Sequence, residues 1–482
     1  MRAAATTMQA PAGTRDRRPA LQPDAAVPMS ERAAPSAGTT DPLRSVEDAL
    51  ATVLAAIPGP TEAETAWIHD ALGRVTAEDA VATTDLPPWD NSAMDGYAIR
   101  AADVAAATEI APVGLKVVGD VAAGADPDIE VQRGTAVRIA TGARLPPGAD
   151  AVVQVELTTP ADADGRPSGP RGRDAVGPAP ARCLVHQAVA VGASIRPAGS
   201  DLRRGAVVLP AGTRIGPAAV AVAAGAGLDH LAVRRRPVVG VLATGNELRS
   251  PGTALGASGI PDANGPALMA LVDDAGGEGR SLGIARDTPA DVKARVCAGL
   301  AEADALIVSG GVSVGPYDHV RAAFEACGTI DLWRVAVQPG KPFAFGTADR
   351  PGGGAPILLF GLPGNPVSTF VTFELFVRPA LRRLQGLTRL HRARDRAVLA
   401  DRTHKSPGRR AFVRVLVERD DEGTPVRDQE GRVRASLAGG PAGQGSHVLS
   451  ALAAADALAV IPETVDVHPA GGDVELWWLD GT

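Results

Sequence analysis

Strand-like and helix-like segments alternate between residues 234 and 386, and this alternation constrains the fold more than any other feature of the chain. The clearest strand is the apolar run at 305–308, which ends in Ser309-Gly310-Gly311. Continuous apolar runs are typical of strands that are buried on both faces of a parallel sheet. The range therefore predicts an α/β domain with helices on both faces of a mostly parallel sheet.

Turns rich in glycine and proline follow the expected strands. Gly310 and Gly311 allow the backbone to turn tightly and to approach a ligand closely. Similar loops occur at 338–342 and 361–366. Open α/β sheets bind ligands at the carboxyl ends of their strands, where helix N-termini supply free N–H groups. These loops together predict a phosphate-bearing substrate.

The composition excludes several other classes of protein. The 482-residue chain has a net charge of -7, so nucleic acid is not expected as its main partner. Its three cysteines include no Cys-x-x-Cys pair, so we expect no disulfide framework and no four-cysteine zinc site. Cys297 and Cys327 are expected in helices as small buried hydrophobic residues. No run approaches the roughly 18 apolar residues of a membrane span, and we expect a cytoplasmic protein that does not bind a membrane.

The regions outside the α/β range are less regular. Residues 1–41 are rich in Ala, Pro and Arg and lack the apolar core of a signal peptide, so a disordered tail is expected; the alternatives are an overlong start and a targeting role. An amphipathic helix is expected at 43–57, capped by Ser45. Thr61 and Glu64 also have the spacing of a capping box. Short strands broken by glycine and proline predict β-rich modules on both sides of the α/β range.

The segment 90–98, Asp-Asn-Ser-Ala-Met-Asp-Gly-Tyr-Ala, strongly resembles the hallmark of the molybdopterin molybdenumtransferase family, which includes bacterial MoeA and the gephyrin E domain. The resemblance continues in order through further motifs, at 141–143, 145–146, 148–153, 244–248, 283–287, 309–311, 339–342, 361–366 and 445–447. One such motif is weak, whereas the ordered set from about residue 43 onward is highly specific.

The resemblance implies the last assembly step of the molybdenum cofactor. Molybdenum from molybdate is inserted into adenylylated molybdopterin, AMP is released, and Mg²⁺ assists. It further implies an elongated homodimer whose active site lies between the α/β domain of one subunit and the β-rich domain of the other. Contact with a molybdopterin adenylyltransferase and with downstream molybdoenzymes is expected.

The resemblance also implies four domains besides the tail. The α/β domain is expected to be similar to the MoaB/Mog proteins. The expected boundaries are 1–41 for the disordered tail, 42–92 with 201–233 for a discontinuous N-terminal linker domain, 93–200 for a β-rich domain with a flexible insertion at 159–182, 234–386 for the α/β domain, and 387–482 for a C-terminal β-barrel.

Three carboxylates are the candidate magnesium ligands and catalytic residues. Asp287 ends an expected strand, Asp318 follows the Ser-Gly-Gly turn, and Glu247 follows a Thr-Gly turn. Mg²⁺ is a hard cation that takes oxygen ligands near phosphates. The alternative is that Asp318 and Glu247 only stabilise helix N-termini. The resemblance favours the functional role.

Further site residues follow from the matched motifs. Lys341 stands between two prolines, where a fixed ammonium meets an anion as a point charge; its alternative is a solvated loop lysine. Arg334 keeps a positive charge where the family often has lysine. Asp95 and Thr141 are expected as catalytic residues of the β-rich domain. The expected substrate-binding residues are Ser309, Gly310, Gly311, Ser313, Arg334, Pro339, Gly340, Pro363, Gly364, Asn365, Pro366, Asp201 and Ser446.

Two rival functions share parts of this pattern. A molybdopterin adenylyltransferase has the same α/β domain, but the 90–98 segment and the flanking β-rich domains argue against it. A pterin-binding carrier without catalysis is disfavoured by the presence of Asp287, Asp318 and Lys341. Two points stay open: His447 as an anion donor or a structural histidine, and tungstate in place of molybdate.

Overall fold

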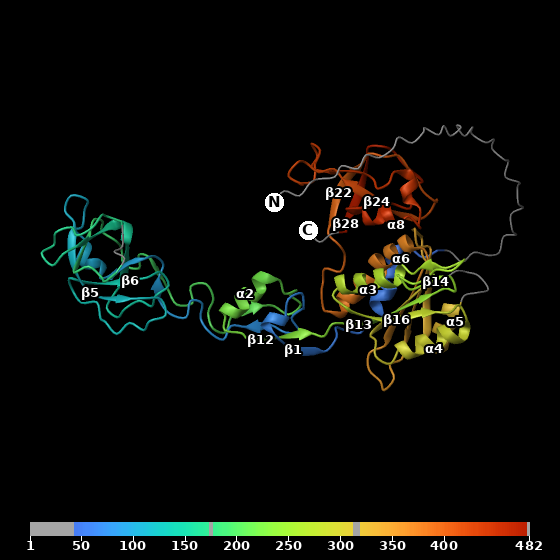
Figure 1. Ribbon diagram of the computed structural model, residues 1–482, viewed down its shortest axis with the longest axis horizontal. Helices are drawn as coiled ribbons and strands as arrows, with labels where there is room; N and C mark the ends of the chain where they lie inside the picture. The colour runs from blue at the N-terminus through green and yellow to red at the C-terminus, as the bar shows by residue number, and fades with distance from the viewer. Residues whose placement is uncertain (1–42, 173–176, 312–318, 480–482) are drawn as a thin grey trace, which may run out of the picture. The chain divides into compact units, whose positions relative to one another are not determined.

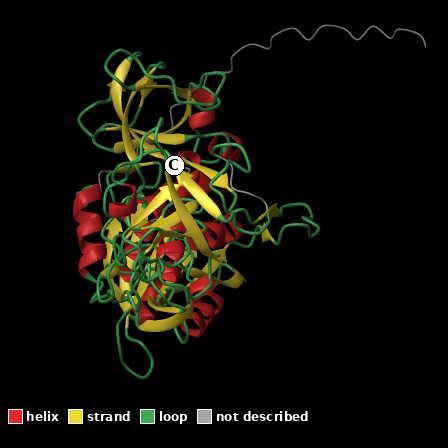
Figure 2. Ribbon diagram, turned by 90° about the vertical axis from the view of Figure 1, so that its left-hand side faces the viewer, coloured by secondary structure: helices red, strands yellow, loops and turns green. Residues whose placement is uncertain are grey.

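The computed structural model describes residues 43–172, 177–311 and 319–479 (Figure 1). Strands and loops make up more of the described chain than helices do (Figure 2). The expected tail at 1–41, Ser313 and Asp318 lie outside the described residues. None of the helices in the described ranges is long and apolar enough to cross a membrane.

The α/β domain contains a six-stranded, mostly parallel sheet, as predicted. Its strands follow the order β16-β13-β17-β21-β20-β18, in which the first four pair in parallel and β20 pairs antiparallel with both β21 and β18. Their bounds are Glu278–Ala285 for β16, Val238–Thr244 for β13, Ala305–Ser309 for β17, Ile357–Leu362 for β21, Pro342–Ala348 for β20 and Thr329–Arg334 for β18. The predicted fold class is confirmed.

Helices cover both faces of this sheet (Figure 1). Ala305 and Ile307 point toward α3 and α6, whereas Leu306 and Val308 point toward α4 and α5, because successive residues of a strand face opposite sides. The helices span Asn264–Asp274 (α3), Pro289–Gly299 (α4), His319–Cys327 (α5) and Pro366–Thr372 (α6), which continues through a π-helical turn, Phe373–Val377, into α7, Arg378–Leu384.

The first described helix, α1 (Val46–Ala55), begins at the predicted cap, where the Ser45 hydroxyl accepts a hydrogen bond from the Asp48 amide at 3.0 Å. Its buried residues Val46, Ala49 and Val53 belong to the same core cluster as the sheet and α7. The range 42–92 had been expected to form part of the linker domain. Helix α1 instead packs on the α/β domain, because its apolar stripe is buried there.

The linker region pairs the two distant segments of the chain that were expected to form it. β1 (Ala63–Trp67) pairs with β12 (His230–Arg234), and β2 (Ala80–Val81) with β11 (Val207–Leu209), beside α2 (Pro217–Gly225). The capping box expected at Thr61 and Glu64 is wrong, because Glu64 lies in β1 and the Thr61 hydroxyl donates to the carbonyl of Arg235 at 2.6 Å.

The β-rich region forms a second six-stranded sheet in the order β7-β4-β6-β5-β9-β8. The bounds are Ala151–Gln154 (β7), Gly96–Ile99 (β4), Thr135–Ile139 (β6), Val113–Val121 (β5), Arg182–Val185 (β9) and Thr158–Ala161 (β8), with β3 (Asn91–Ser92) pairing with β10 (Ile195–Arg196) beside the sheet. The expected insertion 159–182 is therefore too wide, because both of its ends are ladder residues of β8 and β9.

The C-terminal region forms the predicted barrel. Strand pairings close a ring through β24, β25, β22, β28, β26 and back to β24. The bounds are Arg394–Leu399 (β22), Arg410–Val417 (β24), Val433–Leu437 (β25), Ala457–Ile461 (β26) and Gly472–Trp478 (β28), with β23 (Thr403–His404), β27 (Val467–His468) and α8 (Leu449–Ala453) outside the ring.

An ion cluster of the buried Glu374 and Arg378, the half-buried Arg392 and the exposed Asp274 joins the α/β domain to the chain that leads into the barrel. The Glu374 side chain is 2% exposed and accepts from Arg378 Nε at 3.0 Å and from Arg392 Nε at 2.9 Å. Arg392 also contacts Asp274 at 2.8 Å. Burial raises the pKa of Asp274, but Arg378 and Arg392 outweigh it and hold the pKa below 3.8. Its contribution to stability is therefore present at neutral pH and is lost as the pH falls through the lowered pKa.

Glu374→Gln should lower the free energy of unfolding by about 2–4 kcal/mol, because it leaves the Arg378 and Arg392 guanidinium groups without a full counter-charge. Urea unfolding at pH 7 measures the change. Glu302→Gln is the control, since the exposed Glu302–Arg280 pair should contribute less than about 1 kcal/mol. Equal effects of the two substitutions would mean that the ion cluster contributes no more to the free energy of unfolding than an exposed ion pair does.

Candidate functional site

The carboxyl ends of β13, β16, β17 and β21 surround a pocket of about 670 Å³, here called the edge pocket. Each strand sends its following turn into this space because parallel strands end at the same edge of a sheet. The predicted residues that line it are Glu247, Asp287, Ser309, Gly310, Gly311, Pro363, Gly364, Asn365 and Pro366. Motifs that are far apart in the sequence therefore meet at one place in the fold.

The backbone conformation directly after β17 requires glycine at two successive positions. Gly310 and Gly311 have φ values of 92° and 67°, a region that side chains with a Cβ rarely adopt. A Cβ on Gly310 would lie 2.7 Å from the Thr244 carbonyl oxygen, and one on Gly311 would lie 2.8 Å from Val320. The turn is therefore pressed against β13 and α5, with its backbone along the pocket.

Asn264, at the start of α3, connects two of these turns and was not predicted as a site residue. Its side-chain amide donates to the Ser309 hydroxyl at 2.8 Å and to the Gly364 carbonyl at 2.7 Å. The buried Asp262 carboxylate holds the start of α3 by accepting from the amides of Asn264 and Gly265, both at 3.0 Å. An Asp-Ala-Asn-Gly sequence ahead of a helix was the available signal.

Two predicted carboxylates, Glu247 and Asp287, line the edge pocket. Within the described ranges, neither side chain has a hydrogen-bond or ion-pair partner, so their oxygens are available to a ligand. This all-oxygen donor set fits a hard cation such as Mg²⁺ better than a softer metal. Among the described residues, no three His, Cys, Asp or Glu side chains are grouped to hold a metal. The third predicted ligand, Asp318, lies outside them.

Asn365 occupies the N-cap position of α6, with Pro366 at the first helical position. Its side chain does not cap the helix. The amide instead donates to the Ser446 hydroxyl at 3.0 Å. This contact links the edge pocket to the C-terminal region, because Ser446 lines the neighbouring pocket.

The neighbouring pocket, here called the cationic pocket, has a volume of about 450 Å³ and shares Pro342 and Ser368 with the edge pocket. Its lining includes four of the predicted residues, Pro339, Gly340, Lys341 and Ser446. Its other basic side chains come from the barrel region and were not predicted: His404, Lys405, Arg409 and Arg414. No carboxylate is among the described residues that line this pocket, so its field is positive.

Two basic groups of this pocket have lowered pKa values. Burial, together with the nearby charges of Arg409 and Arg334, lowers the pKa of Lys341. Arg414 is 1% exposed and its guanidinium donates to the Gly445 carbonyl at 3.1 Å, while its buried Nε has no partner among the described residues. Burial lowers the pKa of Arg414 to about 10. Unpaired cations of this kind favour a bound anion.

Four predicted residues of the described chain line neither pocket. Asp95 and Thr141 lie in the β-rich region, where Asp95 Oδ1 accepts from the Thr141 amide at 2.7 Å and from its hydroxyl at 2.9 Å. Both are exposed. Asp201 lies at the start of the returning linker segment, with its amide bonded to the Leu86 carbonyl. Arg334, at the end of β18, acts on the cationic pocket through its charge on Lys341.

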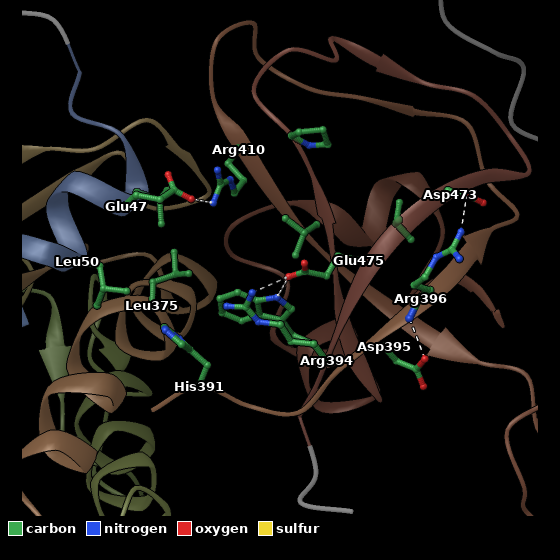
Figure 3. A pocket seen from close by; sticks show the side chains of 15 residues that line it. Glu47, Leu50, Leu375, His391, Arg394, Asp395, Arg396, Arg410, Asp473 and Glu475 are labelled. Atoms are coloured by element: carbon green, nitrogen blue, oxygen red, sulfur yellow. Dashed lines mark hydrogen bonds and ion pairs between the residues drawn. The ribbon is translucent and has the colours of Figure 1, made fainter. Parts of the chain in front are cut away.

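A larger hollow of about 1120 Å³ lies between α1 and the barrel (Figure 3). Its charges are largely paired within the hollow, as in Glu47 with Arg410 and Arg396 with Asp473. Arg394 lies 4.7 Å from the centre of the Trp477 ring. None of the predicted site residues lines this hollow, so the edge pocket and the cationic pocket together are the candidate active site.

Comparisons with known proteins agree with this arrangement. Residues 44–227 match the family model of the MoeA N-terminal region (domain I and II), residues 240–383 a probable molybdopterin binding domain, and residues 396–479 the MoeA C-terminal region (domain IV). The chain is 37% identical to molybdopterin molybdenumtransferase 2 of Mycobacterium tuberculosis, over 86% of this chain and 94% of that protein. The chain belongs to the molybdopterin molybdenumtransferase family.

Other members of the molybdopterin molybdenumtransferase family give the same result. The chain is 32% identical to the molybdopterin molybdenumtransferase of Haemophilus influenzae, over 88% of this chain and 98% of that protein. The structure of the molybdopterin biosynthesis MoeA protein from Pyrococcus horikoshii matches with a TM-score of 0.71 and 29% identity, over 91% of this chain and all of that chain. The resemblance noted from the motifs is confirmed.

Lys341→Ala should weaken the binding of a tetrahedral oxyanion about 10- to 100-fold, because a charge-assisted contact in a pocket without carboxylates is lost. Equilibrium dialysis with molybdate measures the affinity. Because the pKa of Lys341 is lowered, wild-type binding should decline with rising pH before the ordinary 10.5 is reached. Lys116→Ala, on an exposed strand position of the β-rich region, is the control. Unchanged affinity in Lys341→Ala would remove this lysine from the anion site.

Proposed function

We propose that the protein transfers molybdenum from molybdate to adenylylated molybdopterin, with release of AMP and dependence on Mg²⁺. Membership of the family, which places the chain in molybdenum cofactor biosynthesis, supports this proposal. The observation that carries the proposal is the contact between two unlike pockets through Pro342 and Ser368. One has carboxylates and a glycine turn, and the other has only basic charges.

The edge pocket suits the phosphate-bearing part of the pterin substrate. The backbone at Gly310 and Gly311 allows close approach of a phosphate, and Asn264 holds the Ser309 and Gly364 turns in register. Glu247 and Asp287, with Asp318, would hold Mg²⁺. The ion would neutralise phosphate oxygens and so make AMP a better leaving group.

The cationic pocket suits molybdate, a tetrahedral dianion. Lys341, Lys405 and Arg409 supply positive charge, and Ser446 supplies a hydroxyl. Arg414 supports the pocket wall by binding the Gly443 and Gly445 carbonyls. Because this pocket opens beside the edge pocket, molybdate would lie next to the pterin dithiolene.

The chemical contribution of these residues is positioning and electrostatic stabilisation. Fixed charges and turns hold the two substrates in adjacent places, which removes much of the entropy cost of their encounter. Lys341 and Arg409 would stabilise negative charge on the leaving phosphate and on the incoming oxyanion without reorganisation. Pro339 and Pro342 stiffen the loop that carries Lys341.

A homodimer would complete the site. Asp95 and Thr141 are held together in an exposed position outside both pockets. We infer that they face the edge pocket of the partner subunit. We further propose contact with a molybdopterin adenylyltransferase as donor and with molybdoenzymes as acceptors, in the cytoplasm.

Single-turnover AMP release from adenylylated molybdopterin tests the reaction. Release should require both molybdate and Mg²⁺, and the pterin product should contain molybdenum. Asp287→Asn should slow release about 100-fold or more, because a ligand charge is lost at the phosphates. Asp349→Asn, an exposed residue in the turn before β21 at the opposite edge of the same sheet, should not change it. Binding of the substrate without AMP formation under any metal condition would instead support a carrier function.

Complementation tests the shared site. Asp95→Asn and Lys341→Ala should each inactivate the protein alone. Co-expressed in equal amounts, they should recover about a quarter of the wild-type activity, because half of the dimers are mixed and each mixed dimer has one intact site. Absence of any recovery, with mixed dimers shown to be present, would place Asp95 and Lys341 in the same subunit's site or outside it.

A further inference from the structure

Two cysteines meet on the outer face of the α/β domain. Cys297 lies in α4 and Cys327 is the last residue of α5, and their sulfur atoms are 2.8 Å apart. Both had been expected as buried hydrophobic residues. Both are in helices, but Cys297 is exposed and Cys327 only half-buried, because they lie at the solvent side of the contact between the helices.

The surrounding packing holds the two sulfur atoms in place. Val292 and Val296 of α4 and Val320 and Phe324 of α5 are fully buried in one core cluster. A disulfide bond is about 2.03–2.05 Å long, so less than about 1 Å of movement separates the present contact from a covalent bond. Rotation of the side chains supplies such a movement without displacing the helices.

We propose that Cys297 and Cys327 form a reversible disulfide with a small disulfide such as oxidised glutathione as the oxidant. The exposed Cys297 thiolate attacks one sulfur of the oxidant, the S–S bond breaks, and one thiolate leaves and takes up a proton. Cys327 then gives its proton to water or buffer and attacks the Cys297 sulfur, which expels the second thiol. Two protein thiols are oxidised and one external disulfide is reduced to two thiols.

The order of the two steps follows from the environment of each thiol. Burial, and then the neighbouring Cys297 sulfur, raise the pKa of Cys327 to about 11. Cys297, which the oxidant can reach, therefore reacts first. Once Cys297 is part of a mixed disulfide it carries no negative charge, and that part of the obstacle to ionising Cys327 disappears. The pair then closes within the protein.

The bond would constrain the candidate active site indirectly. Cys297 and Cys327 are 30 positions apart, and the chain between them contains β17 and the Ser309-Gly310-Gly311 turn of the edge pocket. A disulfide reduces the freedom of the segment that it encloses, so local opening of this segment should become rarer. Neither cysteine lines the edge pocket or the cationic pocket, so the disulfide would leave both pockets open to ligands.

Thiol mapping of the full-length protein after equilibration with oxidised glutathione tests the proposal. Peptide mass spectrometry should find Cys297 joined to Cys327 and both thiols restored by reduced glutathione. Cys183 is the internal control, because it is fully buried and its pKa is raised to about 12 by burial, so it should stay a thiol. Cys327→Ser should accumulate glutathione on Cys297, whereas Cys297→Ser should leave Cys327 largely unmodified.

Hydrogen exchange gives a second readout that does not depend on enzyme activity. In the oxidised wild type, amides of β17 and α5 should exchange about tenfold more slowly than in the reduced protein, with no such change in Cys297→Ser. Persistent labelling of both thiols by iodoacetamide after equilibration, or glutathione that stays on Cys297 of the wild type, would overturn the proposal. Because no turnover is measured, this result is separate from that of the AMP-release experiment.

Discussion

The buried central strand β17 is the constraint on which the site depends. All five of its residues are buried, and it pairs in parallel with β13 on one side and β21 on the other. Ser309 stands opposite both Ala243 and Leu362, so three strands end at the same level. The turns that follow them therefore meet, and Asn264 needs only one side-chain amide to connect two of them.

Charge is divided between two sources in the fold. The α/β domain supplies the carboxylates of the edge pocket, Glu247 and Asp287, while the barrel region supplies most of the basic side chains beside Lys341. An acidic and a basic region can lie this close without neutralising one another because each is held by its own backbone framework. One pocket therefore offers oxygen ligands that suit a cation, and the other offers positive charge that suits an anion.

The sequence was sufficient for features that depend on local patterns. The apolar run at 305–308 indicated β17, the alternation over 234–386 indicated the parallel sheet, and Ser45 indicated the start of α1. It failed where distant segments decide the outcome. The capping-box spacing at Thr61 was overridden by pairing of β1 with β12. Arg409 and Arg414 were missed because their approach to Lys341 requires closure of the barrel, which no local pattern reports.

The short strand β19 (Val337–Gln338) gives the barrel a further role. It pairs with β24 at Arg410 and Ala411, and the Gln338 side chain accepts from the Ser406 amide at 2.8 Å, just before the loop that carries Lys341. Contacts between the α/β domain and the barrel thus fix the position of the loop that carries Lys341. An α/β domain separated from its barrel would keep the glycine turn, but it would lose the strand pairing that positions the Lys341 loop and the basic side chains that surround it.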